Sequence, residues 1–211
     1  MILIGMFDSP FVRRVAVSLE TLGYEFEHYN WSVGKDQLEI RKYNPLGRVP
    51  VLVLDSGESL IESSAMLDYL DGEVGPQRAL IPPAGAERRR ALHLLGLLTG
   101  AMDKGIQRVY DRVFKPVEKH HQPWIDRCTD QMKSALALLE TECAKLAPDA
   151  WLLGAQPMQP DITLGCFITY LKEAAFLDLA AYPAIKALVE RCEALPAFQA
   201  VYAPFSTPKV K

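Results

Sequence analysis

The sequence predicts two domains, a small α/β domain followed by an all-helical domain. Over residues 1–80, short strand patterns alternate with helical patterns and continue into a hairpin, which is typical of a βαβ unit followed by antiparallel strands. Prolines and glycines at residues 75–86 form a connector in which a helix cannot continue. Every strong pattern after this connector is helical. We therefore place the first domain at residues 1–78, a linker at 79–86 and the second domain at 87–211.

The first strand is expected at residues 2–4, which are all apolar. Ser9 and Pro10 predict the start of a helix, because serine favours the N-cap position and proline the first helical turn. Apolar residues then recur at helical spacing until Gly23 ends the pattern. Alternation with period two over residues 24–29 predicts a second strand, parallel to the first through a right-handed crossover.

The rest of the first domain is interpreted as a hairpin followed by a helix. Residues 31–43 are polar and irregular, and residues 44–47, Asn-Pro-Leu-Gly, predict a turn. A β-branched run at residues 49–54 and a short segment at 59–61 predict the two strands of the hairpin, with turn residues between them. A helix is expected to begin at Ser63.

The second domain contains long helical patterns. Apolar residues at steps of three and four predict two amphipathic helices, within residues 92–113 and 128–146. Residues 162–171 carry no charged side chain, so we expect this helix to be surrounded by others. A further helix is expected over residues 185–195.

Composition and charge exclude several classes of protein. Of the 211 residues, 49% are hydrophobic and 23% are charged, which is the balance of a globular chain with an ordinary core. The net charge of −3 gives no reason to expect nucleic acid as a partner. The longest uncharged stretch, residues 194–208, is broken by prolines and is too short for a bilayer span, so we expect no membrane segment. The first apolar residues lack a preceding basic region, which predicts a cytoplasmic protein without a secretory signal.

Metal sites and the common hydrolytic motifs are not indicated. The four cysteines lack the close spacing of zinc ligands and fall within helical patterns, so we interpret them as buried thiols. They are Cys128, Cys143, Cys166 and Cys192. His120 and His121 are adjacent, and adjacent helical residues point about 100° apart, which favours a loop or helix start over a metal site. Motifs for nucleotide hydrolysis, zinc proteolysis and α/β-hydrolase chemistry do not occur.

Three short segments of the first domain are candidates for chemistry: residues 9–11 (Ser-Pro-Phe), 48–50 (Arg-Val-Pro) and 62–63 (Glu-Ser). Each also has a purely structural interpretation. Ser9 could act only as an N-cap that contributes about 1 kcal/mol to helix stability, and residues 62–63 could cap the next helix. Pro50 could simply begin a strand.

The order and spacing of these segments resemble the cytosolic glutathione S-transferase family, in its bacterial serine type. The resemblance covers almost the whole chain. It rests on residues 9–15 (SPFVRRV), 44–52 (NPLGRVPVL) and 60–63 (LIES), and on Pro160-Asp161-Ile162 at the entry to the buried helix. Met158 stands where the family has a capping serine or threonine, so one side-chain cap is expected to be missing.

The resemblance implies a thioredoxin-like first domain that binds glutathione as co-substrate and a helical second domain that binds an electrophile. It assigns to Val49 the backbone groups that pair with the cysteinyl part of glutathione, and it implies a cis bond before Pro50. Glu62 would face the γ-glutamyl amine, and Ser63 at a helix N-terminus would face the α-carboxylate.

The resemblance also assigns a catalytic role to Ser9, whose hydroxyl would donate to the glutathione sulfur. A charge-assisted hydrogen bond of roughly 1.5–3 kcal/mol would lower the thiol pKa by about one to two units. Lys35 and Arg48 are candidates for the glycyl carboxylate. Serine replaces a redox cysteine at this position, and Val12 stands where a second cysteine would be, which disfavours disulfide exchange.

The second substrate and the reaction type are less closely defined. Met102, Ile106 and Tyr110 share one face of the first long helix, where the family builds its electrophile site, although a core stripe is an alternative role for them. The family implies a homodimer, a function in detoxification, and conjugation, isomerisation or dehalogenation as reactions. The Ser-Ser-Cys run of the isomerase branch is not matched, since Ser9 lies between Asp8 and Pro10.

A second hypothesis is a non-catalytic protein of the same fold that acts as a protein-interaction or regulatory module. The three motifs occur together, and a pure scaffold has no need of all of them. A thiol-disulfide or peroxide-reducing enzyme is disfavoured by the missing cysteine at position 9.

Overall fold

The computed structural model describes residues 1–174 and 177–207. These residues form two compact units, of which the first comprises Met1–Pro83 with the chain from Ala194 onward, and the second comprises Ala84–Glu193. The sequence-based boundaries place the chain from Ala194 onward in the second domain, whereas its described residues belong to the first unit. The thioredoxin-like and all-helical classes predicted from the sequence are both confirmed.

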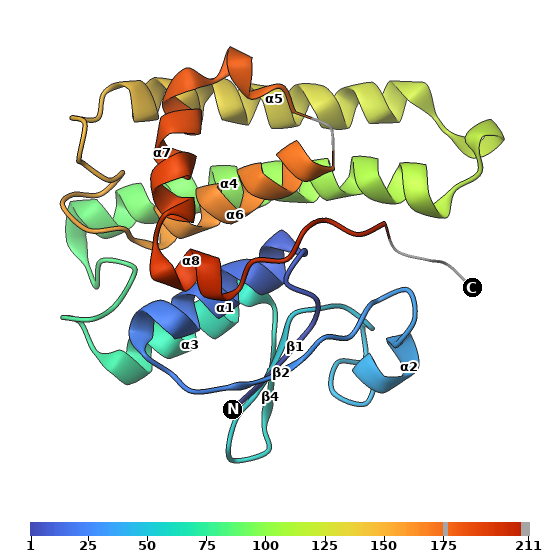
Figure 1. Cartoon of the computed structure of the whole chain (residues 1–211), viewed down its shortest axis with the longest axis horizontal. Coiled ribbons are helices and arrows are strands. Elements are labelled where there is room, and N and C mark those ends of the chain that lie inside the picture. Colours follow the sequence, from blue (N-terminus) through green and yellow to red (C-terminus); the bar gives the residue numbers. More distant parts are fainter. Residues whose placement is uncertain (175–176, 208–211) are drawn as a thin grey trace. The chain divides into compact units, whose positions relative to one another are not determined.

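The first unit contains a four-stranded mixed sheet of order β2-β1-β3-β4 (Figure 1). The strands are β1 (Ile2–Ile4), β2 (Glu27–Tyr29), β3 (Val51–Val53) and β4 (Ser59–Ile61). Strand β1 pairs in parallel with β2 and antiparallel with β3, and β3 and β4 form the predicted hairpin. The second strand is shorter than the alternation over residues 24–29 predicts.

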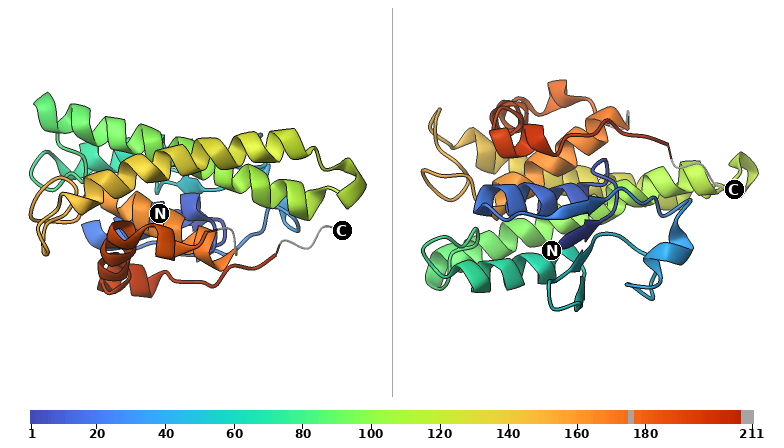
Figure 2. Two further views of the ribbon diagram at one scale, coloured as in Figure 1. Left: turned by 90° about the horizontal axis from the view of Figure 1, so that it is seen from above. Right: turned by 60° about the horizontal axis from the view of Figure 1, so that its bottom comes forward.

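The predicted first helix is α1 (Pro10–Leu22), with Ser9 at its N-cap and Pro10 in its first turn. Gly23 ends the helix in the left-handed conformation at φ 77°, which a glycine adopts without steric cost. Helix α3 (Ser63–Val74) begins where the sequence predicts. Helix α1 packs against both α3 and the short helix α8 (Pro196–Ala200) (Figures 1 and 2). Arg13 of α1 donates to the carbonyl of Phe198 at 3.1 Å.

An apolar cluster joins the sheet to α2 (Gln37–Ile40), a four-residue helix within a segment that the sequence predicts to be irregular. Ile40 is the only buried residue of α2, and it packs with Ile4, Val51 and Val53. A single apolar residue in one helical turn creates no periodic pattern, so the sequence carries little signal for this helix.

The second unit is helical, as predicted. Its two long helices, α4 (Gly85–Phe114) and α5 (Gln122–Ala144), pack against each other (Figure 2, left). Helix α6 (Gln159–Glu173) is buried along nearly its whole length, which confirms the helix predicted from the uncharged run. Helix α7 (Pro183–Glu193) packs on α5 and α6. Two short 3-10 turns, Val117–Lys119 and Leu179–Ala181, complete the described elements.

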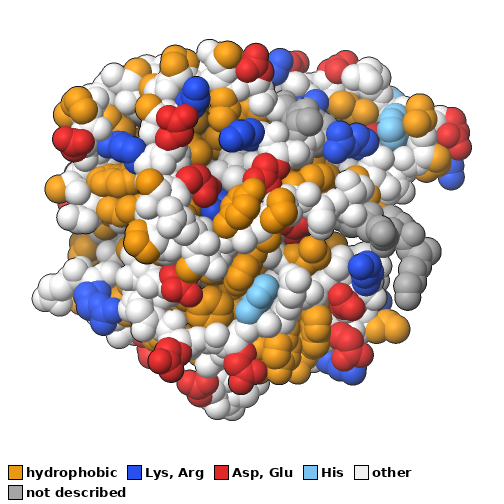
Figure 3. Space-filling model, in the orientation of Figure 1, with side chains coloured by type: hydrophobic (Ala, Val, Ile, Leu, Met, Phe, Trp, Pro, Cys, Tyr) orange, Lys and Arg blue, Asp and Glu red, His pale blue; other side chains and the backbone are white. Residues whose placement is uncertain are grey.

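Two further features of the described chain are the distribution of its surface charges and the hydropathy of its helices. On the face drawn in Figure 3, lysine and arginine side chains are interspersed with aspartate and glutamate over most of the surface, and several acidic side chains lie together at its lower edge. Of the helices in the described part of the chain, none combines the length and the hydropathy that crossing a bilayer requires.

Candidate functional site

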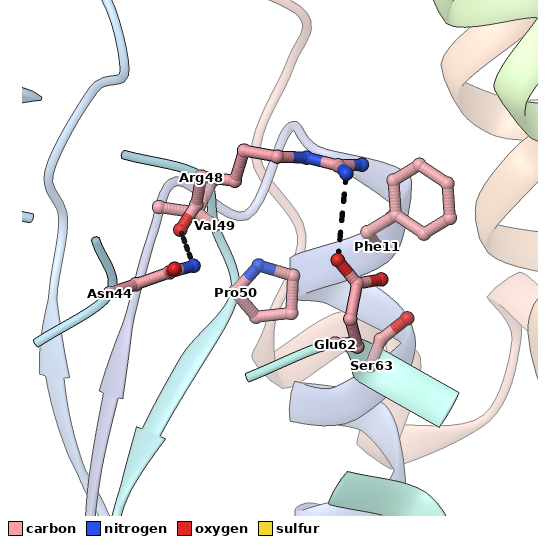
Figure 4. A pocket seen from close by; sticks show the side chains of 7 residues that line it. All are labelled: Phe11, Asn44, Arg48, Val49, Pro50, Glu62 and Ser63. Atoms are coloured by element: carbon pink, nitrogen blue, oxygen red, sulfur yellow. Dashed lines mark hydrogen bonds and ion pairs between the residues drawn. The ribbon is translucent and has the colours of Figure 1, made fainter. Parts of the chain in front are cut away.

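A pocket in the first unit gathers side chains from three segments that are distant in the sequence (Figure 4). Helix α1 contributes one residue, the loop before β3 contributes four, and the start of α3 contributes two. The lining residues are Phe11, Asn44, Arg48, Val49, Pro50, Glu62 and Ser63. This pocket therefore brings together five of the residues that the sequence analysis singled out. Phe11 and Asn44 are additions, although both lie inside the motifs already quoted.

Val49 lines this pocket at a special peptide bond. The Val49-Pro50 peptide bond is cis, which confirms the expectation from the sequence. Strand β3 begins at Val51, so Val49 lies just outside the sheet ladder. Within the described residues, no hydrogen bond engages the amide or the carbonyl of Val49. Both groups are therefore available to pair with an extended ligand.

Asn44 holds the loop that leads to Val49. It is 2% exposed, and its Nδ2 donates to the carbonyl of Arg48 at 2.8 Å. Its Oδ1 accepts from the amide of Leu46 at 3.0 Å, which closes a turn on its own backbone. Since a buried amide with both ends bonded has one stable orientation, Asn44 restrains the backbone that precedes Val49.

Glu62 has an unusual backbone conformation. With φ 67°, it is the single non-glycine residue of the described chain at positive φ, a conformation that costs about 1–3 kcal/mol and often occurs at functional sites. Its carboxylate lies 3.5 Å from Nη1 of Arg48 (Figure 4). Both side chains are about 60% exposed, so this ion pair adds little to stability and leaves both charges accessible.

Ser63 begins α3 at the floor of the pocket. The residue is buried, yet no hydrogen bond to its hydroxyl is found within the described residues. The amides of Ser63 and Ser64 also lack partners there, as is usual in the first turn of a helix. Hydroxyl and amides together make a site for an anion, beside the negative charge of Glu62. The arrangement complements a group that carries both a carboxylate and an amine.

Ser9 occupies the N-cap of α1, but its side chain makes no capping hydrogen bond. Its amide donates to the carbonyl of Met6 at 3.1 Å, and its carbonyl accepts from the amide of Arg13 at 2.8 Å. The hydroxyl thus does not perform the role that the structural interpretation gives it. Ser9 is not among the pocket-lining residues, whereas Phe11, two residues further along the chain, is.

The loop that carries Ser9 contacts the pocket through Gly5. This residue has φ 131°, and a Cβ added there would lie 2.8 Å from the Cβ of Val49 and 2.6 Å from Cγ2 of Val12. Only glycine fits so close an approach. Gly5 therefore joins the Ser9 loop directly to Val49.

The other candidate residues lie elsewhere. Lys35 is exposed in the turn before α2 and does not line the pocket. In the second unit, Met102 has no exposed surface and belongs to the core, while Ile106 is half-buried. Tyr110 is 40% exposed, and its ring packs edge-on against Phe114 with 5.0 Å between centroids.

The cysteines have the predicted structural role. All four are free and buried. Burial raises the pKa of the Cys143 thiol to about 12 and that of Cys192 well above its usual value, so neither is a nucleophile at neutral pH. Within residues 1–174 and 177–207, no three His, Cys, Asp or Glu side chains gather where they could hold a metal ion.

Two family models match this chain. One, described as the N-terminal domain of glutathione S-transferase, matches residues 3–78, and the other, described as its C-terminal domain, matches residues 122–191. An Escherichia coli K12 protein named "Uncharacterized GST-like protein YibF" is 30% identical over 139 residues, which cover 65% of this chain and 67% of the relative. The chain belongs to the glutathione S-transferase family.

Other members of the glutathione S-transferase family resemble it over greater lengths. Maleylacetoacetate isomerase of Pseudomonas aeruginosa is 28% identical over 194 residues, 88% of each chain. A family member from Pseudomonas fluorescens Pf-5, solved with bound glutathione, has a TM-score of 0.82 and 30% identity, covering 97% of this chain and 99% of its own. One from Methylobacterium radiotolerans, in complex with glutathione sulfonate, has a TM-score of 0.87 and 28% identity, covering 100% and 99%.

Proposed function

We propose that this glutathione-dependent transferase binds glutathione in the pocket of its first unit and ionises the thiol at Ser9 for attack on a small hydrophobic electrophile. One observation carries the proposal. Glu62, Ser63 and the unpaired backbone of Val49 converge on a single pocket, and together they complement the amine, the carboxylate and the peptide of that ligand. The relatives solved with glutathione or its sulfonate support the same ligand.

The γ-glutamyl end binds at the start of α3. The Glu62 carboxylate accepts hydrogen bonds from the ligand's ammonium group, and the hydroxyl of Ser63 with the first amides of α3 donates to its α-carboxylate. The cysteinyl part pairs with the amide and carbonyl of Val49 in the manner of an added strand. Pro50 forms part of the wall beside it.

The glycyl carboxylate requires a cation at the other end of the ligand. Lys35 is exposed, and among the described residues the Arg48 side chain pairs only with the solvent-accessible carboxylate of Glu62. Because the ligand's amine takes over the Glu62 carboxylate, the Arg48 side chain becomes available to the glycyl end on binding.

The proposed mechanism is of the serine type and rests on Ser9. Its hydroxyl is not engaged in capping and donates to the ligand's sulfur, which favours the thiolate near neutral pH. For the electrophile, the second unit offers Ile106 and Tyr110 as accessible apolar side chains, whereas Met102 has no exposed surface. A cytoplasmic location fits the dependence on reduced glutathione.

Conjugation is the proposed reaction, and isomerisation is a second candidate because a maleylacetoacetate isomerase is among the relatives. The two reactions differ in the fate of the thiol. Conjugation consumes glutathione, whereas isomerisation returns it unchanged. Free thiol and product should therefore be measured in the same assay. An activated chloronitrobenzene serves as the substrate for conjugation, and a maleyl compound serves as the substrate for isomerisation. Loss of one thiol for each product supports conjugation, and constant thiol with product formed supports isomerisation.

Binding tests the proposal before any substrate is known. Titration calorimetry of the purified chain with glutathione should show saturable heat. No heat at millimolar glutathione would reject the proposed function and favour a non-catalytic interaction module.

We also propose a homodimer that packs through α3 and α4. The first two turns of α4 carry a run of charges, Glu87 to Arg90, beside apolar residues, which suits an interface of mixed polarity. Light scattering should give twice the mass of the 23.5 kDa chain, and the mass of one chain would refute the dimer.

A further inference from the structure

The loop between β1 and α1, residues 5–9, carries Ser9 at its end and is contacted from β2 by the side chain of His28. Nε2 of His28 lies 2.7 Å from the carbonyl oxygen of Gly5. The His28 ring also stacks on Phe7, with 3.7 Å between centroids and 6° between planes. A carbonyl can only accept a hydrogen bond, so Nε2 carries the proton and donates it. His28 thus contacts two of the five loop residues.

Gly5 has little freedom to move. Its amide donates to the carbonyl of Tyr29 at 3.0 Å, so β2 holds both backbone groups of Gly5. The residue is buried, and its Cα lies so close to Val49 and Val12 that an added Cβ would meet both below 3.0 Å. Any displacement of Gly5 is therefore transmitted to Val49, which lines the pocket, and to α1.

The far end of the loop is held differently. The amide of Ser9 donates to Met6 at 3.1 Å, and the Asp8 carboxylate accepts from the amide and the hydroxyl of Ser206 at 3.0 and 3.1 Å. These bonds restrain the Ser9 end of the loop, and the stack of Phe7 on His28 restrains its middle. The Ser9 hydroxyl itself has no capping bond that would fix its place.

We propose that His28 is a positioning residue for Ser9: through Gly5 and Phe7 it holds the loop in the one arrangement that keeps the Ser9 hydroxyl at hydrogen-bonding distance from the bound thiol. This inference rests on the proposed role of Ser9. His28 contacts no reacting atom. Its effect is exerted through geometry, since a hydrogen bond to a thiolate weakens steeply as donor and acceptor separate or lose alignment.

The two contacts of His28 can be removed one at a time. His28→Phe keeps a ring that stacks on Phe7 and removes the donor to Gly5, whereas His28→Gln keeps a donor and removes the ring. His28→Ala removes both. Glu27→Ala is the matched control, because Glu27 lies on the same strand, is exposed, and pairs with Ile2 rather than with the loop.

The test is the ultraviolet absorbance of the bound thiolate, followed against pH in the glutathione complexes. We expect His28→Ala to raise the pKa of the bound thiol by about one unit, which lowers the thiolate fraction and the turnover near neutral pH by up to about tenfold. The affinity for S-methylglutathione, which has no thiol to ionise, should change by less than about twofold. Each single-contact variant should give a smaller shift, and Glu27→Ala none.

The double variant with Ser9→Ala separates positioning from general structural damage. If His28 acts through Ser9, His28→Ala should add no further pKa shift to Ser9→Ala. A wild-type thiol pKa in His28→Ala, or an additive shift in the double variant, would overturn the inference while leaving the role of Ser9 intact. An unchanged pKa in Ser9→Ala alone would overturn both. If His28→Ala does not fold, His28→Phe and His28→Gln carry the same comparison.

Discussion

Two helix starts in this molecule use an acidic residue in opposite ways. At α6, the Asp161 carboxylate is fully buried and accepts from the amides of Leu152 at 2.9 Å and Met158 at 3.0 Å. At α3, the Glu62 carboxylate is exposed, makes no capping bond and faces the pocket from a backbone at positive φ. The carboxylate at the first start is satisfied within the fold, and the carboxylate at the second start stays available to a ligand.

The difference shows where to look for function at helix ends. Met158 stands at the N-cap of α6, where a serine or threonine is expected. The Asp161 carboxylate nevertheless accepts a hydrogen bond from the Met158 amide, so the half of the capping box that depends on Asp161 is present. At α1 and α3 no side-chain cap is made, although both starts carry residues suited to it. An uncapped helix start with capable side chains is what an anion-binding site requires.

The largest expected effect is on the α6 side of this comparison. Asp161→Ala leaves the amides of Leu152 and Met158 without their acceptor in a buried region, at roughly 1–3 kcal/mol each, so we expect a loss of about 4 kcal/mol in the free energy of unfolding. Urea denaturation measures this loss. Glu62→Ala should cost less than about 0.5 kcal/mol, and equal losses in the two variants would erase the distinction.

The pH dependence of stability should reveal the same carboxylate. Burial raises the pKa of Asp161 to about 6, against the effect of its backbone hydrogen bonds. Between about pH 4 and 6, the folded state still holds the Asp161 proton, whereas the unfolded state has released it. The contribution of Asp161 to the free energy of unfolding therefore falls as pH rises through that window, by up to about 3 kcal/mol. It is constant above the window. The free energy of unfolding of the wild type minus that of Asp161→Asn, measured by urea denaturation at each pH, should show this fall. A difference that does not change with pH would contradict the prediction.

On the α3 side, the expected effect is on binding. Glu62→Ala with Ser63→Ala removes charge-assisted bonds to the γ-glutamyl end, so glutathione affinity should fall by about 100-fold, or about 2.7 kcal/mol. Calorimetry measures this change. Ser64→Ala is the matched control, because Ser64 is the exposed neighbour on the same helix and does not line the pocket. A similar loss in the control would mean that the helix, and not its pocket residues, had been damaged.

The smallest expected effect is the release of strain at Glu62. Glycine adopts φ 67° without steric cost, so Glu62→Gly should raise the free energy of unfolding by up to about 1 kcal/mol while weakening glutathione binding. Thermal denaturation and calorimetry measure the two changes. A lower stability in this variant would show that Glu62 is kept for the fold and not for a ligand.

Much of the fold could be predicted because its signals are local. Ser9, Pro10 and Gly23 mark the ends of α1, and the uncharged run marks α6, since capping and burial each act within a few residues. Helix α2 was not predicted, because one turn with one buried side chain leaves no periodicity. Helix α8 belongs to the first unit through contacts with α1 from the far end of the sequence, which no local pattern records.

The candidate site was predictable only in part. Arg48, Val49, Pro50, Glu62 and Ser63 line one pocket because their motifs flank adjacent elements of one sheet and helix layer. Phe11 and Asn44 line it as well, but their roles depend on where a ring and an amide point after folding. The contact of His28 with the Ser9 loop joins residues 23 apart, and a single histidine in a strand pattern gives no sign of it.

The most direct measurement is the ionisation of bound glutathione at Ser9. Its hydroxyl makes no capping bond, so Ser9→Ala should leave the melting temperature nearly unchanged while raising the pKa of the bound thiol by about one to two units. Thiolate absorbance of the two complexes, followed against pH, records this shift. Coincident titration curves together with a lowered melting temperature would contradict the account, since they would make Ser9 a helix cap and leave the thiol to be activated by another group.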